Sequence, residues 1–405
     1  MPLMSRLSAT LLFSALFLLG GVMAPPTIMA QDIRMSTLVD SLAGAVGGVA
    51  VDRGGAVYTA DFRDTVWKIE PDGRVSRFAT GLYGASGNTF DSEGRLLQSN
   101  FFGHTLTRID RDGTKEVVVR DGLNGPVGVT VHPSGQIYLD NCAGNEVVRI
   151  DPADWSVHPF ASGELFRCPN GIIAGPDSAL YVVNFSDPYV VRIGLDGHAE
   201  RFATIPGGGN GHIAVAGGSF FVTAFQTHEV YRVDMDGTVS LAASDGLRFP
   251  NGIAAGPAGD RVYINEYVNR FPPNVEHPPV PHSRVRQLQL PGILDVMVQA
   301  LRSTGVEGMV RAHDAFKKRV ASYTELDLNG LGYALLNQGQ LQAAVEVFRL
   351  NVRDYPASAN VYDSLAEALA GTGDTEGAIA NYRRSLELNP GNTNAETQLK
   401  RLENR

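Results

Sequence analysis

Short apolar runs alternate with Gly, Pro and Asp-Gly pairs through the N-terminal two thirds of the chain. Within this region an apolar anchor recurs every 40 to 43 residues, at Ile69, Ile109, Ile150, Ile193 and Val233. Each unit contains four runs of strand-forming residues, separated by the residues that hairpin turns prefer. Four strands at a period of about 40 residues are typical of a propeller blade. Six such units predict an all-β six-bladed β-propeller over residues 31–290.

The two ends of this repeat region complement each other. The sixth unit stops after its third predicted strand, whereas the segment MSTLVDSLAG, which precedes the first unit, matches the outer strand VSRFATGLYG of that unit. We therefore expect residues 34–42 to complete blade six as its outer strand. Closing the ring in this way removes an open strand edge that would otherwise invite aggregation.

From about Pro291 the apolar positions change to a helical spacing. Two units 34 residues apart then match each other, with Leu331, Leu335, Gly339, Ala344, Phe348 and Pro356 repeated as Leu365, Leu369, Gly373, Ala378, Tyr382 and Pro390. This pattern resembles tetratricopeptide repeats, in which small residues lie where two helices cross. It predicts a helical linker or cap over 291–325, followed by an all-α tetratricopeptide-repeat domain with a capping helix over 326–405. Such a domain is expected to hold a protein partner.

Residues 1–30 have the pattern of a secretory signal. Arg6 precedes a long apolar run, and small residues offer a cleavage site after Ala30. This pattern predicts a periplasmic or secreted protein, with an uncleaved membrane anchor as the alternative. No other segment is apolar enough to span a bilayer. The net charge of −9 argues against a nucleic-acid partner.

In a propeller, ligands usually bind at the channel mouth, where the inner strands begin and the second strands end. Asn170 and Asn251 stand just before two inner strands, in two copies of the phrase Pro-Asn-Gly. The second strand ends at Phe225 in the fifth unit and at a polar residue in the others: Asp61, Asn100, Asn141, Asn184 and Glu266. Converging amide and carboxylate oxygens suit Ca²⁺ or Mg²⁺, or a polar ligand. The alternative is that each side chain bonds its own backbone and fixes a turn.

Three further features belong to the same face. Aromatic residues flank the polar positions and either wall a pocket or pack between blades; they are Phe62, Phe101, Phe185 and Tyr267. Cys142 and Cys168 fall in loops of blades three and four, so we expect a disulfide between these blades, with two free thiols as the alternative. The proline-rich segment 267–283 is expected to form a partial lid, or else a spacer toward the helices.

The blades resemble the family of senescence marker protein, gluconolactonase and luciferin-regenerating enzyme, and also NHL-type propellers. The resemblance spans about 34–290 and implies a divalent metal that polarises a lactone or ester carbonyl and helps to activate water. The family holds its metal with a Glu on the first inner strand, a Pro-Asn-Gly asparagine and an Asp. Asn170 matches the asparagine, whereas Gly47 stands where the Glu is expected and Gly211 where the Asp is expected.

Carried over to this chain, the resemblance implies a cation site made of Asn170, Asn251 and Glu266. It also implies a substrate contact at Asn100. The other predicted substrate-binding residues are Asp61, Asn141, Asn184 and Tyr267.

His212 lies next to the predicted mouth, where a neutral imidazole can act as a general base. Streptogramin lyase, another propeller enzyme, uses histidines near its channel together with a divalent metal. Three functions therefore stay open at this point. They are a metal-assisted hydrolase of lactones or esters, a lyase with His212 as base, and a non-catalytic scaffold. In the scaffold, the propeller binds a small-molecule ligand or a peptide, and the tetratricopeptide repeats hold a partner protein.

Overall fold

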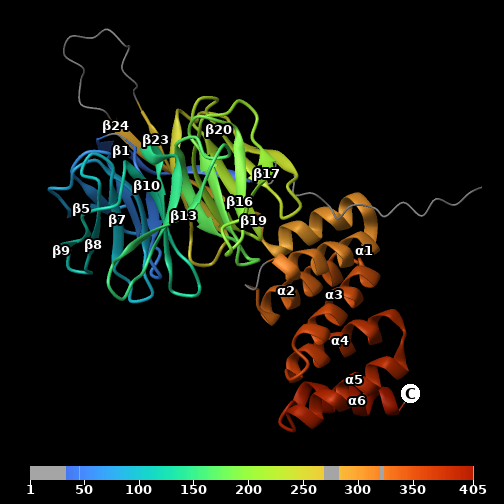
Figure 1. Ribbon diagram of the computed structural model, residues 1–405. Coiled ribbons are helices and arrows are strands. Elements are labelled where there is room, and N and C mark those ends of the chain that lie inside the picture. Colours follow the sequence, from blue (N-terminus) through green and yellow to red (C-terminus); the bar gives the residue numbers. More distant parts are fainter. Residues whose placement is uncertain (1–32, 45, 269–281, 320–322, 405) are drawn as a thin grey trace, which may run out of the picture.

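The computed structural model describes residues 33–44, 46–268, 282–319 and 323–404. Six four-stranded antiparallel sheets form the N-terminal part, and Figure 1 shows them arranged as the blades of a propeller. The inner strands are β2 (Val49–Val51), β6 (Ala85–Phe90), β10 (Pro126–Val131), β14 (Pro169–Ala174), β18 (Asn210–Ala216) and β22 (Pro250–Ala255). The second strands are β3 (Val57–Ala60), β7 (Leu96–Asn100), β11 (Ile137–Asn141), β15 (Leu180–Asn184), β19 (Ser219–Ala224) and β23 (Arg261–Tyr267).

The third and outer strands complete the blades. The third strands are β4 (Val66–Ile69), β8 (Thr105–Ile109), β12 (Glu146–Ile150), β16 (Tyr189–Ile193), β20 (Glu229–Val233) and β24 (His282–Gln289). The outer strands are β5 (Val75–Ala79), β9 (Lys115–Val119), β13 (Val157–Ser162), β17 (Ala199–Thr204), β21 (Val239–Ala243) and, for blade six, β1 (Arg34–Ala43). The predicted six-bladed propeller is therefore confirmed, including its number of blades.

The core of the propeller lies between adjacent blades. Because side chains alternate between the two faces of a strand, each blade presents apolar residues to both of its neighbours. Between blades four and five, for example, Tyr181 packs against Phe220 with ring centroids 4.2 Å apart. The second strands of blades one to five are buried along their whole length, which explains the apolar runs in the sequence.

The closure of the ring follows the expected route. Strand β1 pairs antiparallel with β24, with Met35 opposite Leu288 and Val39 opposite Val285. The sheet order β1-β24-β23-β22 therefore joins the start and the end of the propeller sequence in one blade. Leu42 is buried against this blade, so the closing strand contributes to the core as well as to the sheet.

The C-terminal part is helical, and Figure 1 shows it stacked beside the propeller. Its helices are α1 (Ile293–Arg319), α2 (Glu325–Asn337), α3 (Leu341–Asp354), α4 (Ala359–Thr372), α5 (Thr375–Leu388) and α6 (Thr393–Glu403). Gly305 adopts a φ of 71° and divides α1 into two helices. Met297 and Met309 on these two helices join the same apolar core as Phe348, so α1 covers one end of the repeat stack.

The helical part joins the propeller on the face opposite the channel mouth. It begins directly after β24, and a cavity of about 70 Å³ lies between them. Gly217 and Gly259, from hairpins that follow inner strands, line this cavity together with Ile293 and Phe316. Among the described residues, no helix has the length and apolar character needed to cross a membrane. The predicted signal over 1–30 and most of the predicted lid over 267–283 fall outside the described residues.

Candidate functional site

The inner strands begin with two residue layers that surround the channel. The pairing registers place equivalent residues of the six blades at the same depth. The mouth layer consists of Gly47, Ser86, Val127, Asn170, Gly211 and Asn251. The glycine layer, one residue further in, consists of Gly48, Gly87, Gly128, Gly171, His212 and Gly252.

The glycine layer exists because adjacent inner strands approach each other closely. A Cβ atom added to Gly48 would lie 2.7 Å from the Cα of Gly87, and one added to Gly171 would lie 2.7 Å from the Cα of His212. Backbone therefore fills the space that a side chain would need. His212 is the exception, because it is the one residue of this layer that carries a side chain.

A pocket of about 240 Å³ opens at the channel mouth. We call it the mouth pocket; it is lined by Val46, Phe62, Phe101, Val127, Cys142, Cys168, Asn170, Phe185, Phe225, Asn251 and Tyr267. One wall residue comes from each blade, at the repeat position directly after Asp61, Asn100, Asn141, Asn184, Ala224 or Glu266. We call this set the aromatic layer: Phe62, Phe101, Cys142, Phe185, Phe225 and Tyr267. The pocket is thus a largely apolar cup built by all six blades.

The rings of the aromatic layer support one another in two arcs. Phe62 and Phe101 have centroids 5.6 Å apart, and Phe185 and Phe225 have centroids 5.7 Å apart, both in tilted arrangements. Tyr267 stands edge-on to Phe225 at 6.2 Å. Contacts of this kind fix ring orientation as well as burying apolar area. Tyr267, predicted to contact a ligand, therefore lies in the pocket.

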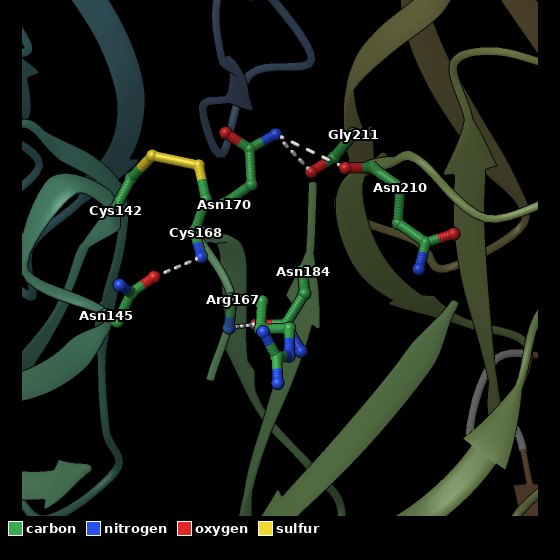
Figure 2. The surroundings of a disulfide bond; sticks show 8 residues. All are labelled: Cys142, Asn145, Arg167, Cys168, Asn170, Asn184, Asn210 and Gly211. Carbon is green, nitrogen blue, oxygen red and sulfur yellow. Dashed lines mark hydrogen bonds between the residues drawn. A yellow bond between two sulfur atoms is a disulfide. The ribbon is translucent and has the colours of Figure 1, made fainter. Parts of the chain in front are cut away.

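A disulfide between Cys142 and Cys168 takes the place of an aromatic ring in blade three, which confirms the predicted pairing. It forms the pocket wall between the two arcs. The backbone N–H of Cys168 donates to Oδ1 of Asn145 at 2.8 Å, which fixes the segment that leads into Asn170 (Figure 2). The disulfide therefore joins blades three and four at the rim of the pocket.

Asn170 and Asn251 lie at the floor of the mouth pocket. Nδ2 of Asn170 donates to the carbonyl oxygen of Gly211 at 2.7 Å and to that of Asn210 at 3.4 Å (Figure 2). Nδ2 of Asn251 donates to the carbonyl oxygen of Val46 at 3.1 Å. Because a backbone carbonyl can only accept, these contacts fix the orientation of both amides. Oδ1 of each side chain has no hydrogen-bond partner among the described residues and is left for a ligand.

The predicted ligand contacts at the ends of β11 and β15 have a structural role instead. Oδ1 of Asn184 accepts from the backbone N–H of Arg167 at 3.0 Å, and its Nδ2 donates to the carbonyl oxygen of Leu165 at 2.9 Å. Asn141 makes the same pair of bonds to the N–H of Asn124 and the carbonyl oxygen of Gly122. Each side chain holds the segment that enters its own blade from the preceding blade, and neither lines the mouth pocket.

Asp61 and Asn100 also depart from the predicted role. Oδ1 of Asp61 accepts from the backbone N–H groups of Arg63 at 2.8 Å and Thr65 at 3.0 Å, which fixes its own turn. Burial raises the pKa of this carboxyl above its usual value, an effect that the two backbone bonds oppose. Nδ2 of Asn100 donates to the hydroxyls of Thr105 and Thr107. Neither side chain lines the pocket.

Glu266 was predicted to hold a cation, but its carboxylate already has cationic partners. It is fully buried, with Oε1 2.5 Å from Nε of Arg284 and 2.9 Å from Nε of Arg286. Its Oε2 accepts from the backbone N–H of Arg248. The fifth unit also differs from the prediction, because Ala224 ends that strand and Phe225 belongs to the aromatic layer.

The divalent cation implied by the family resemblance does not fit these residues. Ca²⁺ takes six to eight oxygen ligands, and carboxylates supply the charge that holds it. The mouth pocket offers the two neutral amide oxygens of Asn170 and Asn251, while Glu266 is neutralised by two arginines in blade six. Nowhere in the described chain do three or more His, Cys, Asp or Glu side chains gather as a metal site would require. We therefore derive no chemistry through a metal.

His212 lies below the mouth pocket rather than in it. Together with Asn88 it lines a chamber of about 330 Å³ whose walls come from the inner strands of all six blades. Its ring makes no hydrogen bond to any described residue, and burial lowers its pKa to about 4. The imidazole is therefore neutral at pH 7 and can both donate and accept one hydrogen bond. His212 therefore does not line the pocket that contains Asn170, Asn251 and Tyr267.

Comparison with known proteins gives two matches of fold. Residues 359–392 match the model of the tetratricopeptide repeat. A gluconolactonase structure from Xanthomonas campestris matches with a TM-score of 0.55 at 20% sequence identity, covering 65% of this chain and 91% of that chain. The propeller has the gluconolactonase-like fold. A structure described as a putative gluconolactonase matches with a TM-score of 0.52 at 18% identity, covering 65% of this chain and 93% of that chain.

The same fold occurs with other chemistry. A PQQ-bound aldose sugar dehydrogenase from Streptomyces coelicolor matches with a TM-score of 0.51 at 14% identity, covering 66% of this chain and 100% of that chain. A search of curated proteins finds no match. At these identities the likeness establishes the gluconolactonase-like propeller, and function has to be argued from the site.

Proposed function

We propose that the propeller is a ligand-binding module whose mouth pocket holds a neutral, ring-bearing small molecule with a hydrogen-bond donor. The aromatic layer carries this proposal, because five blades direct Phe or Tyr to one repeat position and the sixth supplies a disulfide. Aromatic walls bind flat apolar rings through dispersion and desolvation. The Oδ1 atoms of Asn170 and Asn251 would accept from a hydroxyl or amine of the ligand.

Binding is supported better than hydrolysis or elimination. The described residues that line the mouth pocket are Val, Phe, Tyr, Asn and a disulfide, so none of them is a histidine or carboxylate that could take a proton from water at neutral pH. His212, the predicted base, lines the chamber below. The non-catalytic scaffold is therefore our first candidate, and the hydrolase of lactones or esters becomes an outcome of the experiment below.

The tetratricopeptide domain completes this proposal. The match over residues 359–392 supports a protein partner bound by the helices. Because the helices join the propeller on the face opposite the mouth, ligand and partner would not compete for space. We further propose that the protein is exported through residues 1–30, since the Cys142–Cys168 disulfide suits an oxidising compartment.

Calorimetry with indole as the probe tests the ligand class, using purified residues 31–405. Indole carries a ring and an N–H donor, and 1-methylindole is its matched control without the donor. We expect wild type to prefer indole, and Asn170→Ala to lose that preference. Phe185→Ala should weaken both probes about tenfold, through lost ring contacts. Equal affinity of wild type for both probes would contradict the role of the two amide oxygens.

The same protein is then assayed against a panel of lactones and aryl esters, with and without a chelator. We expect no turnover. Turnover that the chelator abolishes and that Asn170→Ala also loses would replace the binding module with the metal-assisted hydrolase.

A further inference from the structure

A side chain one residue before the strand end bridges neighbouring blades in three places. In each case the side chain donates to the backbone carbonyl of the mouth-layer residue in the next blade. The bridges are Ser99 Oγ to Val127 O at 2.5 Å, Thr223 Oγ1 to Asn251 O at 2.5 Å, and Asn265 Nδ2 to Gly47 O at 2.9 Å. The position thus serves as a hydrogen-bond donor that holds the mouth layer in place.

Asp140 occupies this position in blade three. In this repeat position the equivalent acceptor is the backbone carbonyl of Asn170, the mouth-layer residue of blade four. Asp140 is fully buried, and neither carboxyl oxygen has a hydrogen-bond partner in the described chain. A Cβ added to Gly128 would contact Oδ2 of Asp140 and lie 2.8 Å from the amide nitrogen of Ile172. The carboxyl group therefore lies between the inner strands of blades three and four.

The protonated state suits a place beside this carbonyl. An ionised carboxylate is an acceptor, and a backbone carbonyl is an acceptor too, so the two repel each other. A protonated carboxyl has an O–H and can donate as the hydroxyls of Ser99 and Thr223 do. Burial raises the pKa of Asp140 well above the usual value for Asp.

No neighbouring charge offers another account. Strands β10 and β14, which flank the carboxyl, carry no titratable side chain. Strand β12 carries Glu146, which accepts from Nδ2 of Asn141 at 3.1 Å, and Arg149, which is exposed. Tyr138, two residues earlier on β11, is directed to the aromatic contact with Phe160.

We propose that Asp140 is a protonated positioning residue, which donates a hydrogen bond from blade three to the carbonyl of Asn170 and thereby holds this residue at the floor of the mouth pocket. Ionisation removes the donor and loosens the junction of blades three and four. The effect on ligand binding rests on the proposed function, whereas the effect on the junction does not.

The direction of the pH effect follows from the raised pKa. The folded protein holds the proton more tightly than the unfolded chain, so stability is highest below the unfolded pKa of about 4. It falls as pH rises from there toward the folded pKa. Asn170 should become less well positioned over the upper part of the same range.

The test compares wild type with Asp140→Asn and Asp140→Ser, which copy Asn265 and Ser99. Melting temperatures are measured from pH 4 to pH 9. We expect the melting temperature of both variants, relative to that of wild type, to rise by several degrees between pH 4 and pH 9. The reverse variant, Ser99→Asp, should install a second pH-dependent junction between blades two and three. A difference between wild type and Asp140→Asn that stays constant across the pH range would overturn the protonated state.

Two readouts separate the parts of this proposal. A protonated carboxyl has its own carbonyl stretch in the infrared spectrum, which wild type should show at neutral pH and Asp140→Asn should lack. Indole affinity of wild type should fall severalfold as pH rises, while that of Asp140→Asn stays constant. If indole binds with the same affinity at every pH, the positioning role is wrong. If indole binds at no pH, the proposed function is wrong, and the melting series still decides the protonation of Asp140.

Discussion

In five of the six blades, two neighbouring residues at the end of the second strand have opposite roles. Asn184 is directed into the segment that enters blade four, where it bonds backbone groups, whereas Phe185 lines the mouth pocket. The same division separates Asp61 from Phe62 and Asn100 from Phe101. Successive side chains leave a strand on opposite sides. The first of the two residues therefore bonds the backbone of the connection, and the next one lines the pocket. Polar side chains near the mouth of a propeller channel are therefore not by themselves evidence of ligand binding.

The physical reason lies in the backbone of the connections between blades. These segments run over buried strand ends, and their N–H groups need acceptors. Asn184 supplies one for Arg167, Asn141 for Asn124, and Glu266 for Arg248. Where a connection makes this demand, the strand end keeps a polar residue whatever the protein binds; blade five, with Ala224 at this position, is the exception.

Glu266 offers the largest test of the structural role. Replacing it by Gln leaves Arg284 and Arg286 buried beside a neutral group, and breaking a buried pair in this way costs about 3–5 kcal/mol. Urea unfolding of Glu266→Gln measures the loss. Glu200→Gln is the matched control, because its pair with Arg192 is exposed and should cost less than about 1 kcal/mol. Equal losses in the two variants would show that Glu266 is not a structural partner.

The disulfide belongs to the aromatic layer, yet it should also stabilise the fold. It closes a loop with a sequence separation of 26, for which the chain-entropy relation gives about 3.5 kcal/mol. The double variant Cys142→Ser/Cys168→Ser should lose this amount in urea unfolding and should no longer respond to reductant. Indole affinity should fall as well, because the wall between the two arcs loosens. Unchanged affinity would show that the wall is held by the aromatic rings alone.

Most of the fold could be predicted because it repeats. The anchor from Ile69 to Val233 shows the blade period, and the match of 34–42 to an outer strand shows how the ring closes. The helical repeats were visible from their 34-residue spacing. In each case the prediction rests on many positions, each of which is weak evidence alone but agrees with the others.

The site was harder to predict because it depends on single positions. Asn170, Asn251 and Tyr267 line the mouth pocket, whereas the polar strand ends do not. The expected end of the second strand in the fifth unit, Phe225, also lies one residue beyond the observed end at Ala224. Asp140 was missed because its partner is a backbone carbonyl, although comparison with Ser99 and Asn265 at the same repeat position could have revealed it.

A pH series on His212 tests the glycine layer, which lies beneath the mouth layer and the aromatic layer. Its pKa is about 4 in the folded protein and about 6.5 in the unfolded chain, so acid must force a proton onto a buried ring. The stability contributed by the neutral ring is present above pH 6.5 and is lost as pH falls to 4, by about 3 kcal/mol. His212→Gln should remove this acid-dependent part when its unfolding is compared with wild type at each pH. A parallel pH dependence in both proteins would mean that the ring is solvated.

The smallest expected loss of stability gives the most direct test of the two roles, because Asn184 and Phe185 are adjacent in the chain. Asn184→Ala removes the acceptor of Arg167 and should cost about 2 kcal/mol in urea unfolding, through an unsatisfied buried N–H. Indole affinity of the folded variant should stay within about twofold of wild type, since Asn184 does not line the pocket. Phe185→Ala should show the opposite pattern, with a larger loss of affinity than Asn184→Ala. If Asn184→Ala lost affinity as strongly as Phe185→Ala, the strand-end residues would belong to the ligand site after all.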